Sequence, residues 1–235
     1  TKDYSALKYQ KVKVLYKETD KVYGIFALTD SNTVLTGVVG DFGEDGGKLK
    51  YDGKKYSLAS KSAVYVNDED AKAKDVATWA DAQKGIVKAY DATAISNNDS
   101  GKISRMNVAA FAVGQVTSVG SDYINVSYKA NNVAGINGKG TFATKLEADD
   151  ATYPSDLKKD DYVAVTAAVN TADGNIGVTK LDVVTGKITG TKNAITAADY
   201  KVTVNGTTYE MAGVTNSDAA DLTLNATVSI VVKGG

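Results

Sequence analysis

Apolar and polar residues alternate along most of the chain, and a two-residue period predicts β-strands. Within residues 11–16, Val12, Val14 and Tyr16 would lie on one face of such a strand. A second run covers residues 22–28, and the polar residues 18–21 between the two runs predict a hairpin. Further strands are predicted at 33–39, 48–51, 57–58, 64–66, 86–90, 108–116, 123–128, 140–146, 162–169, 176–188, 201–204, 209–211 and 228–232.

Pairs of Asn or Asp with Gly separate many of these runs, at 52–53, 137–138, 173–174 and 205–206. Asp52-Gly53 and Asn205-Gly206 are flanked by alternating apolar residues, which is the strongest short-range signal for a hairpin. We therefore expect tight two-residue turns at these two places.

Helical signals are weak in this chain. Residues 70–84 could hold a few helical turns, with Ala73, Val76 and Trp79 on one stripe. The pattern as a whole predicts an all-β protein with short helices at most.

A short strand motif with a central glycine recurs three times, at Gly37, Gly114 and Gly186, with intervals of 77 and 72 residues. We call these three the anchor glycines. Downstream of each, a polar turn leads into an apolar run, at residues 83–87, 159–163 and 224–228. Ordered landmarks at a similar interval indicate tandem repeats.

The landmarks divide the chain into four predicted segments: the tail of a preceding unit at 1–33, a β repeat unit at 34–110, a second at 111–183, and a truncated third at 184–235. About five short strands in each unit are enough for a small barrel or sandwich. The predicted fold is therefore all-β, with tandem small β-barrel or β-sandwich repeat domains.

Composition excludes several classes of function. With 27 basic and 28 acidic residues, the net charge of −1 argues against nucleic acid as a partner. The chain has neither histidine nor cysteine, so the commonest general base, the commonest metal ligand and thiol chemistry are all missing, and we expect no enzyme. No run of about 18 apolar residues is present, so we expect no membrane span. The chain starts without Met or a signal peptide, which favours a piece of a longer protein.

Residues 22–30, 34–39 and 51–56 together resemble the β-repeat regions of large Gram-positive cell-surface proteins of the S-layer and S-layer-homology type, and residues 184–211 look similar. The resemblance covers most of the chain through its repeats, as a general sequence texture. It implies an extracellular subunit at the cell surface that assembles with copies of itself into a lattice, often with calcium. It also implies anchoring to a cell-wall polymer, through segments outside this chain.

Acidic residues after predicted strands are the only ligand-like feature. We take Asp68, Glu69 and Asp70, together with Asp149 and Asp150, as the candidate calcium ligands. Ca²⁺ takes six to eight oxygens, which carboxylates and loop carbonyls supply. No EF-hand pattern is present, and the alternative interpretation is a solvated turn that keeps strand edges soluble.

The sequence therefore favours a structural S-layer subunit segment with calcium as its one candidate cofactor. The alternative is a cell-surface adhesin or carbohydrate-binding stalk that uses some of the 14 tyrosines, although tyrosines at strand positions are more often part of the core. A phage structural protein stays open.

Overall fold

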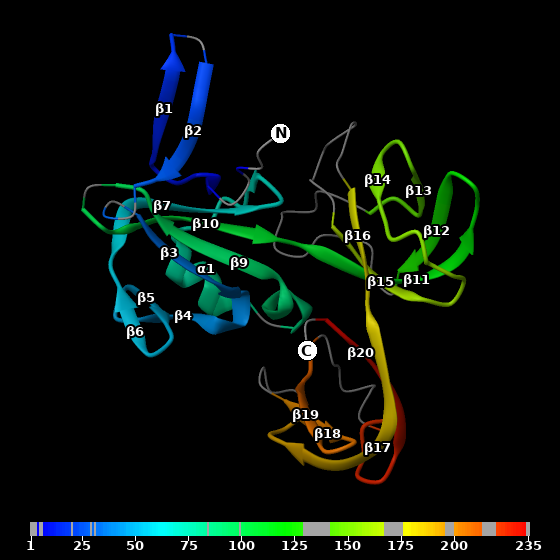
Figure 1. The fold of residues 1–235 in the computed structure, drawn as a ribbon. Helices are drawn as coiled ribbons and strands as arrows, with labels where there is room; N and C mark the ends of the chain where they lie inside the picture. The colour runs from blue at the N-terminus through cyan, green and yellow to red at the C-terminus, as the bar shows by residue number, and fades with distance from the viewer. Residues whose placement is uncertain are drawn as a thin grey trace. The chain divides into compact units, whose positions relative to one another are not determined.

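The computed structural model describes residues 4, 7–19, 21–28, 30, 32–83, 85–98, 100–128, 142–166, 176–195, 200–212 and 220–233. In this part of the chain, the strands form five sheets and are accompanied by one α-helix and short 3-10 helices (Figure 1). The predicted all-β class is confirmed. Contacts divide the chain into two compact units, residues 1–83 with 91–108 and residues 84–90 with 109–235.

The first unit contains a five-stranded sheet and a three-stranded sheet. The larger has the order β3 (Thr33–Val38), β9 (Asp91–Ser96), β10 (Ile103–Ala109), β7 (Leu58–Val66) and β8 (Glu69–Asp70). Within it, β10 and β7 run parallel. The smaller is the meander of β4 (Phe42–Asp45), β5 (Lys48–Tyr51) and β6 (Lys54–Tyr56).

The helix α1 (Val76–Ala82) packs in the first unit, inside the range predicted for it. It begins at Asp75, whose side chain accepts a hydrogen bond from the Thr78 backbone N–H at 2.8 Å, as an N-cap does. Its residues Val76 and Trp79 are buried, and they join a core that includes Leu49 of β5.

The second unit contains a six-stranded and a four-stranded sheet. The first has the order β13 (Lys145–Glu147), β12 (Tyr123–Tyr128), β11 (Phe111–Val119), β15 (Tyr162–Thr166), β16 (Ile176–Lys180) and β14 (Ala151–Thr152). The second has the order β19 (Thr207–Glu210), β18 (Lys201–Val204), β17 (Asp182–Lys192) and β20 (Thr227–Val232). Ile188, Val202 and Val204 form the centre of its core.

Both predicted Asx-Gly turns are confirmed. Asp52-Gly53 joins β5 to β6 and Asn205-Gly206 joins β18 to β19, with positive φ at all four residues. Two central residues with positive φ are the signature of the type I′ turn, whose twist matches the flanking strands. The pairs at 137–138 and 173–174 lie outside the described residues.

Some predicted strands differ from the structure. Residues 86–90 were expected to be a strand, but Gly85–Ala89 is a 3-10 helix, η4, in which the Tyr90 N–H donates to the Val87 carbonyl at 3.0 Å. The strand that does pair in this region, β9, begins one residue later. Residues 176–188 are two strands, because the chain changes sheets at Leu181. Of the predicted strand at 140–146, the structure describes residues 142–146, and among these Lys145 and Leu146 are in a strand.

The three anchor glycines lie in three different sheets. Each lies opposite a residue of an antiparallel neighbouring strand: Gly37 opposite Ala92 in β9, Gly114 opposite Val163 in β15, and Gly186 opposite Val228 in β20. The repeat boundaries themselves stay a prediction.

The second and third anchor strands also share a bulge. Three residues after each anchor glycine, the pairing skips Thr117 in β11 and Thr189 in β17. Each threonine hydroxyl donates to a carbonyl of the adjacent strand at 3.3 Å, from Thr117 to Asn125 and from Thr189 to Thr203. The two strands are therefore built alike in backbone detail as well as in sequence.

Candidate functional site

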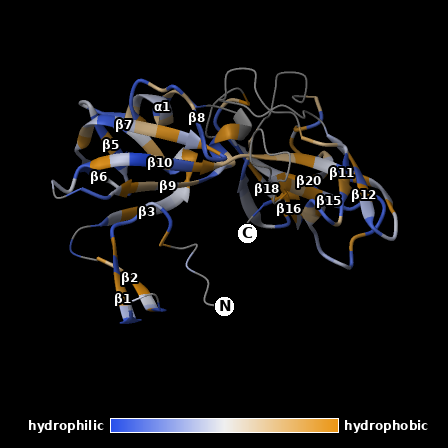
Figure 2. Cartoon of the chain, turned by 90° about the horizontal axis from the view of Figure 1, so that it is seen from above, coloured by the Kyte–Doolittle hydropathy of each residue, from blue (hydrophilic) through white to orange (hydrophobic). Residues whose placement is uncertain are grey.

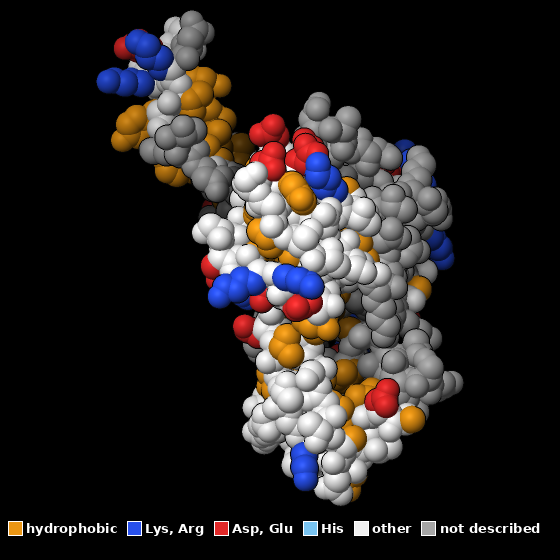
Figure 3. Space-filling view, turned by 90° about the vertical axis from the view of Figure 1, so that its right-hand side faces the viewer, with side chains coloured by type: hydrophobic (Ala, Val, Ile, Leu, Met, Phe, Trp, Pro, Cys, Tyr) orange, Lys and Arg blue, Asp and Glu red, His pale blue; other side chains and the backbone are white. Residues whose placement is uncertain are grey.

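The hairpin of β1 (Val12–Glu18) and β2 (Lys21–Ala27) is the most exposed apolar feature of the described residues. The two strands pair antiparallel, as predicted, and within the described part of the chain they have no third strand beside them. Figure 1 shows the hairpin projecting from the rest of its unit. Its exposed side chains include Leu15, Tyr16, Val22 and Phe26. Figure 3 shows hydrophobic side chains on this projection, and Figure 2 shows the apolar stretches along both strands.

An asparagine clamps the base of the hairpin. The Asn32 side chain accepts a hydrogen bond from the Lys11 N–H at 2.9 Å and donates to the Lys11 carbonyl at 2.8 Å. It also donates to the Leu28 carbonyl at 3.0 Å, and the Leu28 N–H donates to the Lys11 carbonyl. One polar side chain thus ties together the entry and the exit of the hairpin, which keeps the projecting strands in a defined direction.

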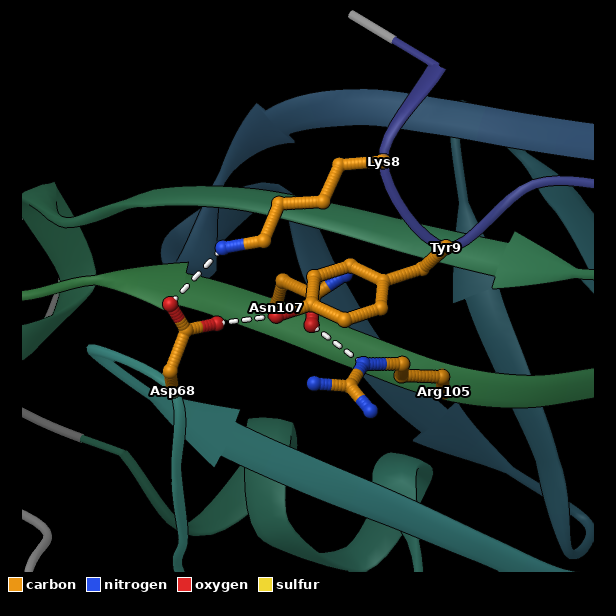
Figure 4. Close-up of polar contacts among 5 residues, drawn as sticks. All are labelled: Lys8, Tyr9, Asp68, Arg105 and Asn107. Carbon is orange, nitrogen blue, oxygen red and sulfur yellow. Dashed lines mark hydrogen bonds and ion pairs between the residues drawn. The ribbon is translucent and has the colours of Figure 1, made fainter. Parts of the chain in front are cut away.

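The chain segment that leads into the hairpin is attached to the β7–β10 sheet through the only arginine of the protein (Figure 4). The Arg105 guanidinium lies between two tyrosine rings, 3.7 Å from the centroid of Tyr9 and 3.5 Å from that of Tyr65. Its Nε donates to the Asn107 side-chain oxygen. Stacking of guanidinium on aromatic faces is favourable, and here it joins residue 9 to strands β7 and β10.

A carboxylate completes this attachment. Asp68 accepts a hydrogen bond from the Lys8 ammonium at 2.8 Å and another from the Tyr9 hydroxyl. Asn67 and Asp68 both have positive φ and form the two-residue turn between β7 and β8, which brings the carboxylate to this edge. The hydrogen bond from Lys8, and then that from Tyr9, lower the pKa of Asp68. We call Lys8, Tyr9, Tyr65, Asp68 and Arg105 the N-terminal latch.

Sequence reasoning missed the latch. Its members lie about 60 and 100 residues apart, and no spacing rule connects them. The single available signal was the isolated arginine, since Arg105 is the only arginine in the chain.

The candidate calcium ligands are distributed over both units. Asp68 is engaged in the latch, and Asp70 accepts hydrogen bonds from the Lys72 backbone at 2.8 Å and the Lys72 ammonium at 2.9 Å. These hydrogen bonds lower the pKa of Asp70. Glu69 lies between them in β8. A cation at Asp68 or Asp70 would have to replace lysine donors.

The other two candidates, Asp149 and Asp150, are exposed in the turn between β13 and β14 of the second unit. Within the described ranges, no three acidic side chains are grouped as a metal ion requires. The calcium site stays a prediction.

No family model, curated protein or solved structure matches this chain. Among the helices of the described part, none has the length and apolar character that a membrane crossing needs.

Proposed function

We propose that this chain is a segment of a surface-layer subunit, an extracellular structural protein that assembles with copies of itself into a lattice at the cell surface. One observation carries the proposal: three sheets each contain an anchor strand, β3, β11 or β17, whose glycine lies opposite a residue of an antiparallel neighbour. Repetition of a strand motif along a chain suits a protein that presents similar surfaces at regular intervals. Attachment to a cell-wall polymer would belong to segments outside this chain.

The charge of the chain supports close packing between copies. The net charge is −1, with 27 basic and 28 acidic residues, so copies do not repel one another through a large charge of one sign. Lysines on strands and carboxylates in turns supply local complementarity, which favours defined orientations over unspecific association.

Electron microscopy and light scattering of the purified chain, with and without millimolar Ca²⁺, test the proposal. We expect ordered sheets or tubes. A chain that stays a monomer in both conditions contradicts the lattice function.

The same experiment tests the calcium expectation if charge-neutralising variants are compared. Asp149→Asn with Asp150→Asn is one pair, and Asp68→Asn with Asp70→Asn is the other. If one pair abolishes the calcium response and the other leaves it intact, the response is assigned to that turn. If assembly does not depend on Ca²⁺ in any variant, the calcium expectation is contradicted.

A second candidate function, an adhesin or carbohydrate-binding stalk, is favoured by one observation. Tyr16 and Tyr23 are 61% and 63% exposed on the hairpin, which also exposes Phe26. Exposed aromatic rings are suitable for stacking on sugar rings. A glycan-binding screen of the unassembled chain, repeated with Tyr16→Ser, tests this function, and binding that the substitution removes would favour the adhesin over the lattice.

A further inference from the structure

Each anchor strand after the first directly follows a two-strand segment that lies inside the preceding sheet. Strands β9 and β10 precede β11, and strands β15 and β16 precede β17. In both cases the first strand of the pair lies against the anchor strand of its own sheet, and the second lies parallel to another strand, β7 or β14. The pair is therefore covered on both edges, and we call it the closing pair.

Like the closing pairs, the hairpin of β1 and β2 directly precedes an anchor strand in the sequence, in this case β3. Unlike the two closing pairs, it has no neighbouring strand on either edge within the described residues. A lone two-stranded hairpin is marginally stable in water. Its apolar side chains Leu15, Val22 and Phe26 are exposed, and exposed apolar patches of this kind mark interaction surfaces.

The last sheet has the complementary feature. Strand β20 lies against anchor strand β17, as β9 lies against β3 and β15 against β11. In the described part of the chain no strand lies on its other side, where β10 and β16 lie in the other two sheets. Val231 of β20 and its cross-strand partner Val183 of β17 are exposed on one face of this strand pair.

We propose that the β1–β2 hairpin of one copy adds to the open edge of β20 in a second copy. The strand of the hairpin that lies next to β20 would run antiparallel to it, as β16 runs antiparallel to β15. Backbone hydrogen bonds would give affinity, and the apolar side chains of both partners would be covered. This inference deepens the proposed lattice function and rests on it, because it names the contact between copies.

The contact joins two different surfaces, so it leads to open chains. Each copy carries one hairpin and one open β20 edge, and a heterologous contact of this kind extends head to tail unless its rotation closes a ring. Such a chain of copies is one direction of a lattice.

Three valine-to-aspartate variants test the contact, because a carboxylate placed in an apolar interface is costly. Val22→Asp disables the hairpin, and Val231→Asp disables the β20 edge; these valines are 51% and 36% exposed. Val119→Asp is the matched control, since Val119 is 46% exposed at the end of β11 and lies outside both surfaces. Sedimentation velocity over a range of concentrations is the measurement.

We expect the unmodified chain and Val119→Asp to form oligomers that grow with concentration. Each of the other two variants alone should associate at least about tenfold more weakly. A mixture of Val22→Asp and Val231→Asp should form a one-to-one dimer, because one intact hairpin meets one intact edge. This result does not require the altered hairpin to be folded, since the Val22→Asp chain contributes only its β20 edge.

A chain that is monomeric at all concentrations overturns the inference, as does a mixture that forms no dimer. Electron microscopy separates this failure from failure of the lattice function. Ordered arrays that persist in both variants would support the lattice function and contradict this contact between copies. Linear oligomers that never form arrays would support the contact between copies and contradict the lattice function.

Discussion

Replacing Gly186 with alanine tests whether the anchor glycines are required by packing. The glycine lies in β17 beneath the side chain of Asn205, the first residue of the β18–β19 turn. A Cβ at position 186 would lie 2.7 Å from the Asn205 Cγ and 2.8 Å from its Nδ2, and closer still to Oδ1. The same amide donates to the Thr185 carbonyl at 3.0 Å, so it has no free direction in which to move without losing that hydrogen bond.

The magnitude follows from three contributions. Alanine in a strand is favoured over glycine by about 0.5–1 kcal/mol, because glycine loses more backbone entropy on folding. Forcing a neighbouring side chain out of its place costs about 1–3 kcal/mol. Loss of the hydrogen bond to Thr185 costs about 1 kcal/mol more. We therefore expect Gly186→Ala to destabilise the four-stranded sheet by about 2 kcal/mol.

Gly190 in the same strand is the matched control. Its nearest neighbour would be the Thr203 Oγ1 at 3.4 Å, an ordinary van der Waals distance. Gly190→Ala should therefore be neutral or stabilising by up to about 1 kcal/mol. Hydrogen exchange of the β17 and β18 amides is the suitable assay, since it reports the opening of this sheet alone.

A double-mutant cycle gives the refuting result. In an Asn205→Gly background the obstructing side chain is gone and a Gly-Gly turn still permits the type I′ conformation. Gly186→Ala should there lose most of its cost. If its cost is the same in both backgrounds, or equal to that of Gly190→Ala, packing against Asn205 is not why a glycine is needed.

Three further predictions concern buried or paired polar groups. Ser96 is fully buried and its hydroxyl has no hydrogen-bond partner among the described residues, so Ser96→Ala should stabilise the first unit by about 1 kcal/mol in urea denaturation followed by tryptophan fluorescence. Because the pKa of Asp68 is lowered from 3.8, this carboxylate stabilises the N-terminal latch at pH values above 3.8, and the contribution is lost as the pH falls through the lowered pKa. The Gln10 N–H of the same segment donates to the Leu7 carbonyl, so its protection factor against hydrogen exchange should fall in acid, and Asp68→Asn should abolish that dependence. The nearly buried Lys88 ammonium pairs with Glu210 at 3.1 Å, so Glu210→Gln should destabilise the second unit by about 1 kcal/mol in calorimetry, whereas an unchanged transition would contradict a stabilising pair.

Local chemistry in the sequence was sufficient to predict the strands with clear alternation and the tight turns. Asp52-Gly53 and Asn205-Gly206 form the expected type I′ turns because only residues that tolerate positive φ serve there, and the neighbouring strands need that twist. Helix α1 is shorter than its apolar stripe because it begins only where Asp75 supplies an N-cap.

Prediction failed where local signals were weak or ambiguous. The short run at 86–90 reads equally well as a strand or as a single turn of helix, and the structure makes it 3-10 helix. Strand β9, Asp91–Ser96, has two alanines and a single large apolar residue, Ile95, so its local strand signal is weak; it becomes a strand because β3 pairs with it. Tertiary pairing outweighs local propensity in such cases.

By itself, the sequence determined the all-β class, the recurring anchor glycines and the absence of histidine and cysteine chemistry. Only the tertiary structure decided which strands are neighbours, and therefore which edges are open and which apolar residues are exposed. The hairpin β1–β2 and the closing pair β15–β16 look alike as local patterns, yet one has open edges and the other lies within a sheet. The same holds for the N-terminal latch, in which Tyr9, Asp68 and Arg105 meet. The physical reason is that strand pairing and side-chain stacking join residues far apart in the chain, so no local pattern encodes them.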